Sequence, residues 1–557
     1  MKIFILGSND RAAIACIHSL KDTGIPIHVI YGDSECPSLK SKYLASTHFI
    51  SQKQKITKTL EKFYEIIPKD AFLLPINDYY LEFCIKFYEE LDSYYQLSFA
   101  TKKATQRIIN KKDLLHVANK LNISTPKSII IKNNKDIDCL DKKNINFPVI
   151  AKPTKSAVIV NEYILSTSVK KISSFDELIL ELKLNIHNSE YIIQEYIPGS
   201  GKALNFFSVN GDIKSAFQYI RINEPGFGGG SSLRKSIPLS NKFLERSKEL
   251  IKEFDYTGIG MIEFRTSFDD KKDYLMEVNA RPWGSISLPI FAGINFPQLL
   301  LHKQLDKKIN FLEYKSDVYA RNILKDINWN LKYGLKEKGL KVFLEPIKAI
   351  FNHQRKIEVF DTLTANDNRP FFKALKNFFS QNFEKVFEKL ISKILLLHSY
   401  LNIRKTSKKI SMIAKKKKIC FVCRGNIIRS KYAQKFYENI SGSVASSCGT
   451  HFSENRNSPP EAIKESAKRN IILDSPVSKT IYSIEEPNKY LFLVMDEKNL
   501  FDLKYKFKIN DVFLLSNAGG GKGIIPDPYH KATDSSQYKD SFNKIEEYLK
   551  KMVKENI

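Results

Sequence analysis

The stretch ICFVCRGNIIRS (419–430) decides the fold of the C-terminal part of this chain. An apolar run leads into Cys423, five residues separate this cysteine from Arg429, and a helical pattern follows. This order predicts a strand, a loop and a helix, in which the loop N–H groups and the helix N-terminus form a concave anion site. The same field favours a thiolate, and an arginine offers a planar fork to a phosphoryl group. We therefore expect Cys423 to attack phosphorus and form a phosphocysteine that water hydrolyses.

Such a reaction needs a general acid to protonate the departing oxygen. The segment IPDPYH (525–530) offers Asp527 in a turn between two prolines. Cys423 taken alone would favour a buried strand cysteine, and it is Arg429 together with Asp527 that favours the phosphate chemistry. For Cys420 and Cys448 we expect only small core side chains.

These residues resemble the low-molecular-weight protein tyrosine phosphatase family over about 417–557. The matching pieces are VCRGNIIRS (422–430), SCGT (447–450), YLFLVMDEKN (490–499) and PDPY (526–529). The resemblance implies a Rossmann-like parallel-sheet domain acting on a phosphotyrosine protein or a small phosphomonoester. It implies that Cys423 is the nucleophile, Arg429 binds phosphate and Asp527 is the general acid. The remaining phosphate-loop residues would be Arg424, Gly425, Asn426, Ile427, Ile428 and Ser430, of which Asn426 and Ser430 brace the loop.

Two positions in the loop bear on the expected redox behaviour and on the expected substrate. Many members of the family carry a second cysteine where this chain has Ile428, so a protective disulfide inside the loop is not expected. Arginine phosphatases of the family have threonine where this chain has Ile427, which favours a phosphotyrosine-like substrate.

The N-terminus predicts a second α/β unit. The apolar run 2–6 ends at Gly7, a helical pattern follows, and 25–31 and 71–78 read as further strands. This β-turn-α-β opening is typical of a parallel sheet. We place this small domain at 1–105.

Oxygen and lysine side chains recur on the strands predicted after this domain. Residues 101–126 read as one helix, 204–221 as a hairpin turning at Asn210-Gly211, 242–255 as a helix and 260–282 as paired strands. Lys152 follows the strand FPVIAKP, and Glu263, Glu277 and Asn279 lie on the paired strands. Hard oxygen ligands suit Mg²⁺, and lysines neutralise a triphosphate, so this set is typical of phosphoryl transfer.

This order resembles the ATP-grasp superfamily, in its carbamoyl-phosphate-synthase-like or amino-acid-ligase-like branch, over about 1–310. The resemblance implies that ATP activates a small-molecule carboxylate as an acyl phosphate, which an amine or another nucleophile captures. The implied ATP-binding residues are Lys111, Lys152, Glu195, Tyr196, Ile197 and Arg281, of which 195–197 form the adenine hinge. Glu263, Glu277 and Asn279 would bind one or two Mg²⁺ ions. GFGGGSSLRKS (226–236) would shape the acceptor pocket.

The chain departs from the superfamily pattern at two places. The segment 153–168, which should cover the triphosphate as a glycine-rich loop, contains no glycine. Gly201 stands where a ribose-binding acid is expected. A nucleotide-binding domain that regulates the phosphatase is therefore the alternative to a working ligase.

The charge pattern bears on partners and location. The net charge is +27, yet the basic residues are spread along the chain without a nucleic-acid motif, which argues against nucleic-acid binding. Residues 370–418 hold 13 Lys or Arg and two Glu, a net charge of +11, beside a phenylalanine-rich helical face. This segment either contacts the inner membrane surface or packs on a domain.

The sequence thus predicts an α/β protein of the cytoplasm, with no transmembrane helix. Its predicted domains are a pre-ATP-grasp subdomain (1–105), the ATP-grasp catalytic domain with two α+β lobes (106–310), a mixed and helical basic linker (311–416) and the phosphatase domain (417–557).

Overall fold

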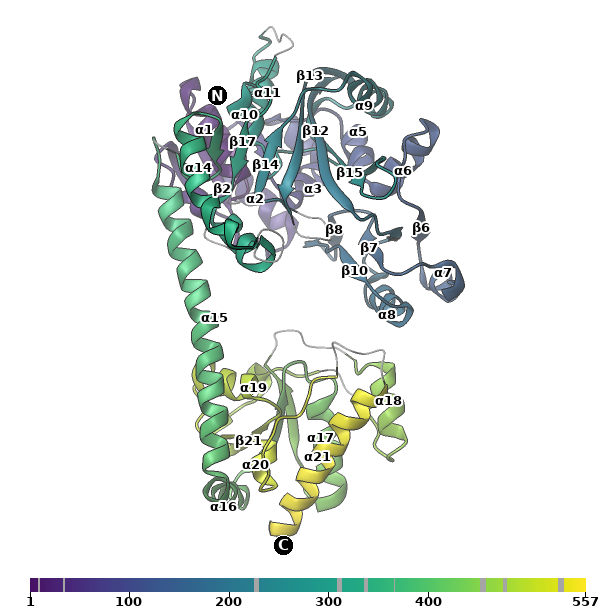
Figure 1. Ribbon diagram of the computed structural model, residues 1–557, viewed down its shortest axis with the longest axis vertical. Coiled ribbons are helices and arrows are strands. Elements are labelled where there is room, and N and C mark those ends of the chain that lie inside the picture. The colour runs from purple at the N-terminus through teal and green to yellow at the C-terminus, as the bar shows by residue number, and fades with distance from the viewer. Residues whose placement is uncertain are drawn as a thin grey trace. The chain divides into compact units, whose positions relative to one another are not determined.

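The computed structural model describes residues 1–556 apart from 9–10, 34–35, 225–229, 308–312, 335–338, 365, 451–456, 474–477 and 529–534. The chain divides into two compact units, Met1–Phe378 and Phe379–Ile557 (Figure 1). Each unit has its own sheets and its own hydrophobic core.

The first unit opens with a parallel sheet, as the sequence predicts, and this sheet has five strands, of which three were expected. Its order is β3-β2-β1-β4-β5, and β1 pairs in parallel with both β2 and β4. The strands are β1 (Ile3–Leu6), β2 (Ile27–Tyr31), β3 (Leu44–Phe49), β4 (Phe72–Pro75) and β5 (Gln96–Leu97). Strand β3 escaped the sequence reading because it is an edge strand whose residues alternate between half-buried and exposed. Helix α1 (Ala12–Leu20) packs against α10 (Ser287–Ala292) and α11 (Phe296–Gln304), so this subdomain shares a core with the next.

Two further sheets complete the first unit. One is an antiparallel sheet of β10 (Lys170–Ile172), β7 (Val149–Pro153), β11 (Tyr191–Glu195) and β6 (Ser128–Ile131). The other runs in the order β16 (Asp273–Asn279), β15 (Gly258–Ser267), β12 (Gly199–Val209), β13 (Asp212–Asn223), β14 (Leu233–Ser236), β17 (Tyr319–Arg321) and β18 (Glu358–Phe360). The predicted hairpin β12–β13 and the predicted pair β15–β16 are both confirmed. Helix α9 (Asn241–Phe254) packs on β12 and β13.

Two local predictions need correction. The helix expected over 101–126 is two helices, α5 (Lys102–Ile109) and α6 (Lys111–Lys120), because Asn110 adopts an extended backbone and its side chain caps α6. The glycine-free segment 153–168 forms a hairpin of β8 (Ala157–Val160) and β9 (Tyr163–Ser166). Asn161 and Glu162 supply the left-handed turn, with φ of 49° and 65°.

The second unit holds a parallel sheet in the order β20-β19-β21-β22, which confirms the expected phosphatase-like architecture. The strands are β19 (Lys418–Cys423), β20 (Ser446–Gly449), β21 (Tyr490–Val494) and β22 (Val512–Leu514). Helices α17 (Arg429–Ser441) and α21 (Ser535–Asn556) pack together beside this sheet (Figure 1).

The basic segment is helical, as predicted. It forms α15 (Arg369–Leu401) and α16 (Ile403–Ala414). Among the residues that the structure describes, no helix combines the length and the apolar character that crossing a bilayer requires.

Candidate active sites

The loop between β19 and α17 gathers the residues predicted for phosphate chemistry. The Asn426 backbone N–H donates to Cys423 Sγ at 3.2 Å, and Cys423 Sγ lies 3.1 Å from Ser430 Oγ. Asn426 has a φ of 49° and its amide donates to Ser430 Oγ at 3.0 Å. The Asn426 N–H thus points toward the sulfur, where it can help to bind an anion.

The loop is held from behind by β20. The Asn426 amide donates to Ser447 Oγ at 2.9 Å, and the Lys479 backbone N–H donates to Asn426 Oδ1 at 2.8 Å. A Cβ added at Gly449 would lie 2.9 Å from Arg424 O and 3.1 Å from Asn426 N, so this close approach requires glycine. The side chains of Ile427 and Ile428 point into the hydrophobic core and anchor the loop there.

Arg429 meets two carboxylates. Its Nη1 donates to Asp496 Oδ2 and to Ile525 O, both at 2.9 Å, and its Nη2 donates to Asp527 Oδ2 at 2.6 Å. Burial lowers the pKa of Arg429, but the negative charges of Cys423 and the two aspartates raise it by more. The net pKa is therefore raised, and the guanidinium stays charged. Tyr529 and His530 of the predicted turn lie outside the described residues.

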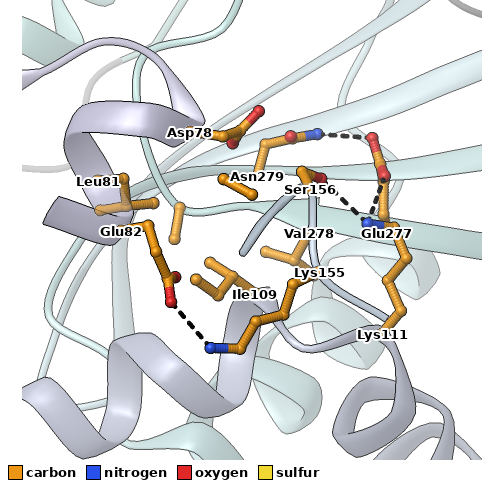
Figure 2. Close-up of a pocket in the computed structure, with 12 residues that line it drawn as sticks. Asp78, Leu81, Glu82, Ile109, Lys111, Lys155, Ser156, Glu277, Val278 and Asn279 are labelled. Carbon is orange, nitrogen blue, oxygen red and sulfur yellow. Dashed lines mark hydrogen bonds and ion pairs between the residues drawn. The ribbon is translucent and has the colours of Figure 1, made fainter. Parts of the chain in front are cut away.

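The lysines and acids predicted for ATP converge in the first unit. Lys111, at the start of α6, donates to Ser156 Oγ at 3.1 Å and lies 3.8 Å from Glu277 Oε2 (Figure 2). Lys152 on β7 is buried and its Nζ donates to Met276 O at 3.3 Å. Burial and the nearby charge of Lys111 lower the pKa of Lys152 to about 8. An anionic ligand placed between these two lysines would relieve that repulsion.

The predicted metal ligands lie side by side on paired strands. Glu263 of β15 stands directly opposite Glu277 of β16, and the Asn279 amide donates to Glu277 Oε1 at 3.1 Å. Arg221 donates to both oxygens of Glu263, at 2.8 and 2.6 Å. Burial raises the pKa of Glu263 and the facing Glu277 adds to this. No cluster of three His, Cys, Asp or Glu side chains suited to a metal occurs in the described parts of the chain.

The remaining predicted nucleotide residues occupy three places. Glu195 ends β11 and is exposed, and Ile197 is buried. Lys171 lies over the Tyr196 ring, 3.6 Å from its centroid. Arg281 forms a bidentate ion pair with Asp78, at 2.7 and 2.8 Å. Asp78 lines the same pocket as Glu277 and Asn279 (Figure 2).

Several contributing residues were not assigned from the sequence. Asp496 lies in the quoted stretch YLFLVMDEKN and Ser447 in SCGT, but no role was attached to them. Asp78 follows β4, where ligand-binding residues of parallel sheets gather, and this position was the available signal. Arg221 and Glu224 carry no sequence signal, since only strand pairing brings them to Glu263 and Gly201. Residues 226–229 of the predicted acceptor stretch lie outside the described residues.

Comparison with known families agrees with this division. Residues 418–556 match the family model of low molecular weight phosphotyrosine protein phosphatases. Residues 188–325 match that of ATP-grasp proteins in the biosynthetic pathway with Ter operon.

Two curated relatives match parts of the chain. A D-aspartate ligase of Enterococcus faecium is 21% identical over 256 residues, which cover 43% of this chain and 60% of the ligase. An uncharacterized protein of Methanocaldococcus jannaschii is 31% identical over 150 residues, which cover 27% of this chain and 35% of that protein.

Similar solved structures include two enzymes. An N5-carboxyaminoimidazole synthetase of Staphylococcus aureus has 16% identity and a TM-score of 0.45, covering 60% of this chain and 86% of its own. An L-amino acid ligase of Bacillus licheniformis has 16% identity and a TM-score of 0.44, covering 57% and 78%. On the evidence of the two family matches, this chain joins an ATP-grasp region to a low-molecular-weight phosphotyrosine phosphatase region, both from families of enzymes.

Proposed function

We propose that this chain is a bifunctional enzyme, a cysteine-dependent phosphatase joined to an ATP- and Mg²⁺-dependent carboxylate ligase. The phosphatase proposal rests on one arrangement. Cys423 Sγ accepts a hydrogen bond from the N–H of Asn426 in the loop, and Arg429 forms an ion pair with Asp527. The ligase proposal rests on the convergence of Lys111 and Lys152 on the facing pair Glu263 and Glu277.

In the phosphatase, the Cys423 thiolate attacks phosphorus and the bond to the leaving oxygen breaks. Asp527 gives its proton to that oxygen, and the resulting carboxylate then takes a proton from the water that hydrolyses the phosphocysteine. Arg429 orients the phosphoryl group. Because a bound phosphate competes with Asp527 for Arg429 Nη2, substrate binding would release Asp527 toward the leaving group. A phosphotyrosine protein or a small phosphomonoester would be the substrate.

In the ligase, Lys111 and Lys152 would bind the phosphates of ATP, residues 195–197 its adenine, and Arg281 its γ-phosphate or the acyl phosphate. Glu263, Glu277 and Asn279 offer the hard oxygen atoms that one or two Mg²⁺ ions prefer, and the position of Glu263 directly opposite Glu277 supports this assignment. Bound Mg²⁺–ATP supplies an activated γ-phosphoryl group. A carboxylate oxygen of the substrate would bond to the γ-phosphorus as ADP leaves, and an amine would then attack the acyl carbon and displace phosphate.

Arg11, a half-buried cation next to Gly284, supports an anionic substrate. The Arg11 guanidinium donates to Ser231 O at 2.9 Å, and a Cβ at Gly284 would lie 2.9 Å from its Nη2. Burial and neighbouring Arg234 lower the pKa of Arg11. We assign this place to the carboxylate substrate because Arg11 and Arg234 both contribute positive charge there, of which Asp361 offsets a part.

We retain four domains, 1–105, 106–310, 311–416 and 417–557, as a proposal about function. Helix α15 crosses from the first compact unit into the second, so the linker contributes to both. All seven cysteines are free thiols, which suits the reducing cytoplasm.

The phosphatase is tested by aryl-phosphate hydrolysis. The Cys423→Ser variant should lose at least about 10⁴-fold in kcat while its thermal unfolding stays unchanged. Full activity in that variant would refute the assignment of the nucleophile.

The ligase is tested by calorimetry of Mg²⁺–ATP binding, followed by a screen of carboxylates and amines for ADP release. Binding that Glu277→Ala abolishes, with ADP release for some substrate pair, would support it. Binding without any turnover would instead favour the alternative, a phosphatase regulated by nucleotide. No binding by the wild type would refute both.

A further inference from the structure

Gly201 stands on β12 where the ATP-grasp pattern predicts an acid. Gly201 stands opposite Arg265, and two residues on, Ala203 stands opposite Glu263. Paired residues of antiparallel strands share a face, and so do residues two apart on one strand. Gly201 therefore lies on the face of the sheet that carries Glu263 and Glu277.

A carboxylate from the neighbouring strand reaches this place. Glu224 follows β13, and its Oε1 accepts a hydrogen bond from the Gly201 backbone N–H at 2.8 Å. A Cβ added at Gly201 would lie 2.8 Å from Glu224 Oε2 and 2.5 Å from Arg221 Cδ. The missing side chain at Gly201 is thus what admits the carboxylate of Glu224.

The second oxygen of the Glu224 carboxylate has no hydrogen bond from the described residues. The Glu224 side chain is only 9% exposed, and among the described residues its Oε2 accepts no hydrogen bond. Arg221 Nη1 lies 3.7 Å from it, too far for a hydrogen bond. A buried carboxylate oxygen in this state favours a ligand that donates hydrogen bonds.

Glu224 is also connected to the predicted adenine hinge. Arg265 Nε donates to Ile197 O at 2.7 Å, and Arg265 Nη1 lies 3.5 Å from Glu224 Oε1. The carboxylate and the hinge backbone are therefore held by the same guanidinium, as adjoining binding sites for one ligand would be.

The geometry points to Glu224 as the acceptor for the ribose hydroxyls of the bound nucleotide, in place of the acid that Gly201 lacks. This inference rests on the proposed ATP site. A vicinal diol offers two donors, and a charged acceptor oxygen that no described residue satisfies discriminates strongly for them.

The test compares ATP with 2′,3′-dideoxy-ATP by calorimetry on the full chain. The wild type should bind ATP about 10- to 100-fold tighter. Glu224→Gln and Gly201→Ala should both reduce this ratio to near one, the second by displacing a carboxylate that stays charged. Glu245→Ala, on the exposed face of α9, is the matched control and should keep the ratio.

Equal affinities in the wild type, or an unchanged ratio in both variants, would overturn the role of Glu224 while leaving the ATP site intact. Absence of any ATP binding by the wild type would overturn the proposed site together with this inference. Thermal melts of the variants confirm that each is folded.

Helix α15 carries a line of exposed apolar side chains in its C-terminal half. Leu390, Ile394, Leu397 and Leu401 are 56%, 51%, 59% and 75% exposed, and their spacing of three or four residues places them in one line along the helix. The other side of the helix packs on the core of the second unit through Leu395, Leu396 and Tyr400. That packing fixes the orientation of the helix, so the apolar stripe faces outward.

Exposed cations lie on the same helix and on the helix that follows it. Lys389 and Lys393 lie on α15, and Arg404, Lys405, Lys408 and Lys409 lie on α16, all exposed. A nucleic acid partner would match the positive charge but would leave the leucines uncovered. A second copy of this chain would cover the leucines but would repel through its own positive charge. An anionic bilayer satisfies both features. We infer that this stripe, Leu390 to Leu401, docks on an anionic membrane surface.

Vesicle sedimentation of the full chain tests this inference. The protein should pellet with phosphatidylglycerol-containing vesicles at low salt, and much less with pure phosphatidylcholine. The double variant Leu390→Glu, Leu397→Glu should bind at least about tenfold less. Val444→Glu, at an apolar position of the same unit that is 88% exposed, is the matched control and should bind as the wild type does.

Two results would overturn the membrane inference. One is equal pelleting of the double variant. The other is failure of the wild type to pellet with anionic vesicles at low salt. If light scattering then shows a dimer that the double variant abolishes, the stripe is a contact between two copies of the chain.

Discussion

At the scale of single residues, the two carboxylates on Arg429 have different surroundings. Asp496 caps α19 (Glu497–Phe501), where its Oδ1 accepts from the Asn499 N–H at 2.8 Å, so it is fixed in place. Asp527 lies in a proline-flanked turn and its side chain is 32% exposed. The first is suited to orienting the guanidinium and the second to moving a proton.

This difference predicts distinct kinetic effects. Asp527→Asn should lower kcat for phenyl phosphate by about 10²- to 10³-fold and affect p-nitrophenyl phosphate less, because a good leaving group needs little protonation. Asp496→Asn should raise KM for both substrates equally. Steady-state kinetics with the two substrates distinguish these outcomes, and a loss at Asp527 that is independent of the leaving group would contradict its role as an acid.

The lowered pKa of Lys152 predicts a proton linkage. Above pH 8 much of Lys152 is neutral in the free protein, whereas a bound triphosphate favours the charged form. Nucleotide binding should therefore take up protons at pH 8 to 9, and affinity should fall as the pH rises through this range. Calorimetry in two buffers of different ionisation enthalpy measures the uptake. Lys152→Arg, which stays charged, should show none, and equal uptake in that variant would exclude Lys152 as the source.

At the scale of elements, the cap between α5 and α6 positions a site residue. Asn110 Oδ1 accepts from the Lys112 N–H at 2.9 Å, and Lys111 is the first residue of α6. Asn110→Ala should cost about 1 kcal/mol of stability and also weaken Mg²⁺–ATP binding, because Lys111 loses its fixed position.

A cap elsewhere in the same unit provides the control for this prediction. Asn133 caps α7 (Asn134–Asp138) with the same 2.9 Å bond to the N–H of Lys135. Asn133→Ala should destabilise the protein without changing nucleotide affinity. Chemical denaturation and calorimetry measure the two effects, and unchanged affinity in Asn110→Ala would show that the cap does not position Lys111.

At the scale of the whole molecule, separate cores predict separate unfolding. Each compact unit contains one proposed site, so a ligand should stabilise only the unit that binds it. Mg²⁺–ATP at about 100 times its Kd should stabilise the first unit by about 2.7 kcal/mol, and vanadate should stabilise the second. Differential scanning calorimetry should therefore show two transitions that move independently, and a joint shift with either ligand would indicate coupled units.

Local sequence determined much of this protein. The strand, loop and helix around Cys423 and the strands β2 and β4 of the N-terminal sheet follow from apolar runs and turn residues that act over a few positions. The interruption at Asn110 was not predicted because a single capping side chain ends the helical pattern there. The hairpin over 157–166 was not predicted because Asn161 and Glu162 form its turn in place of glycine.

Only the tertiary structure decided which distant side chains meet. Arg429 with Asp496, Arg281 with Asp78, and Gly201 with Glu224 are separated by 67, 203 and 23 positions, so no spacing along the chain announces them. Strand register and helix packing bring them together, and these depend on burial of the whole core. The sequence alone specified the chemistry of each half, and the fold specified the partners that hold and tune it.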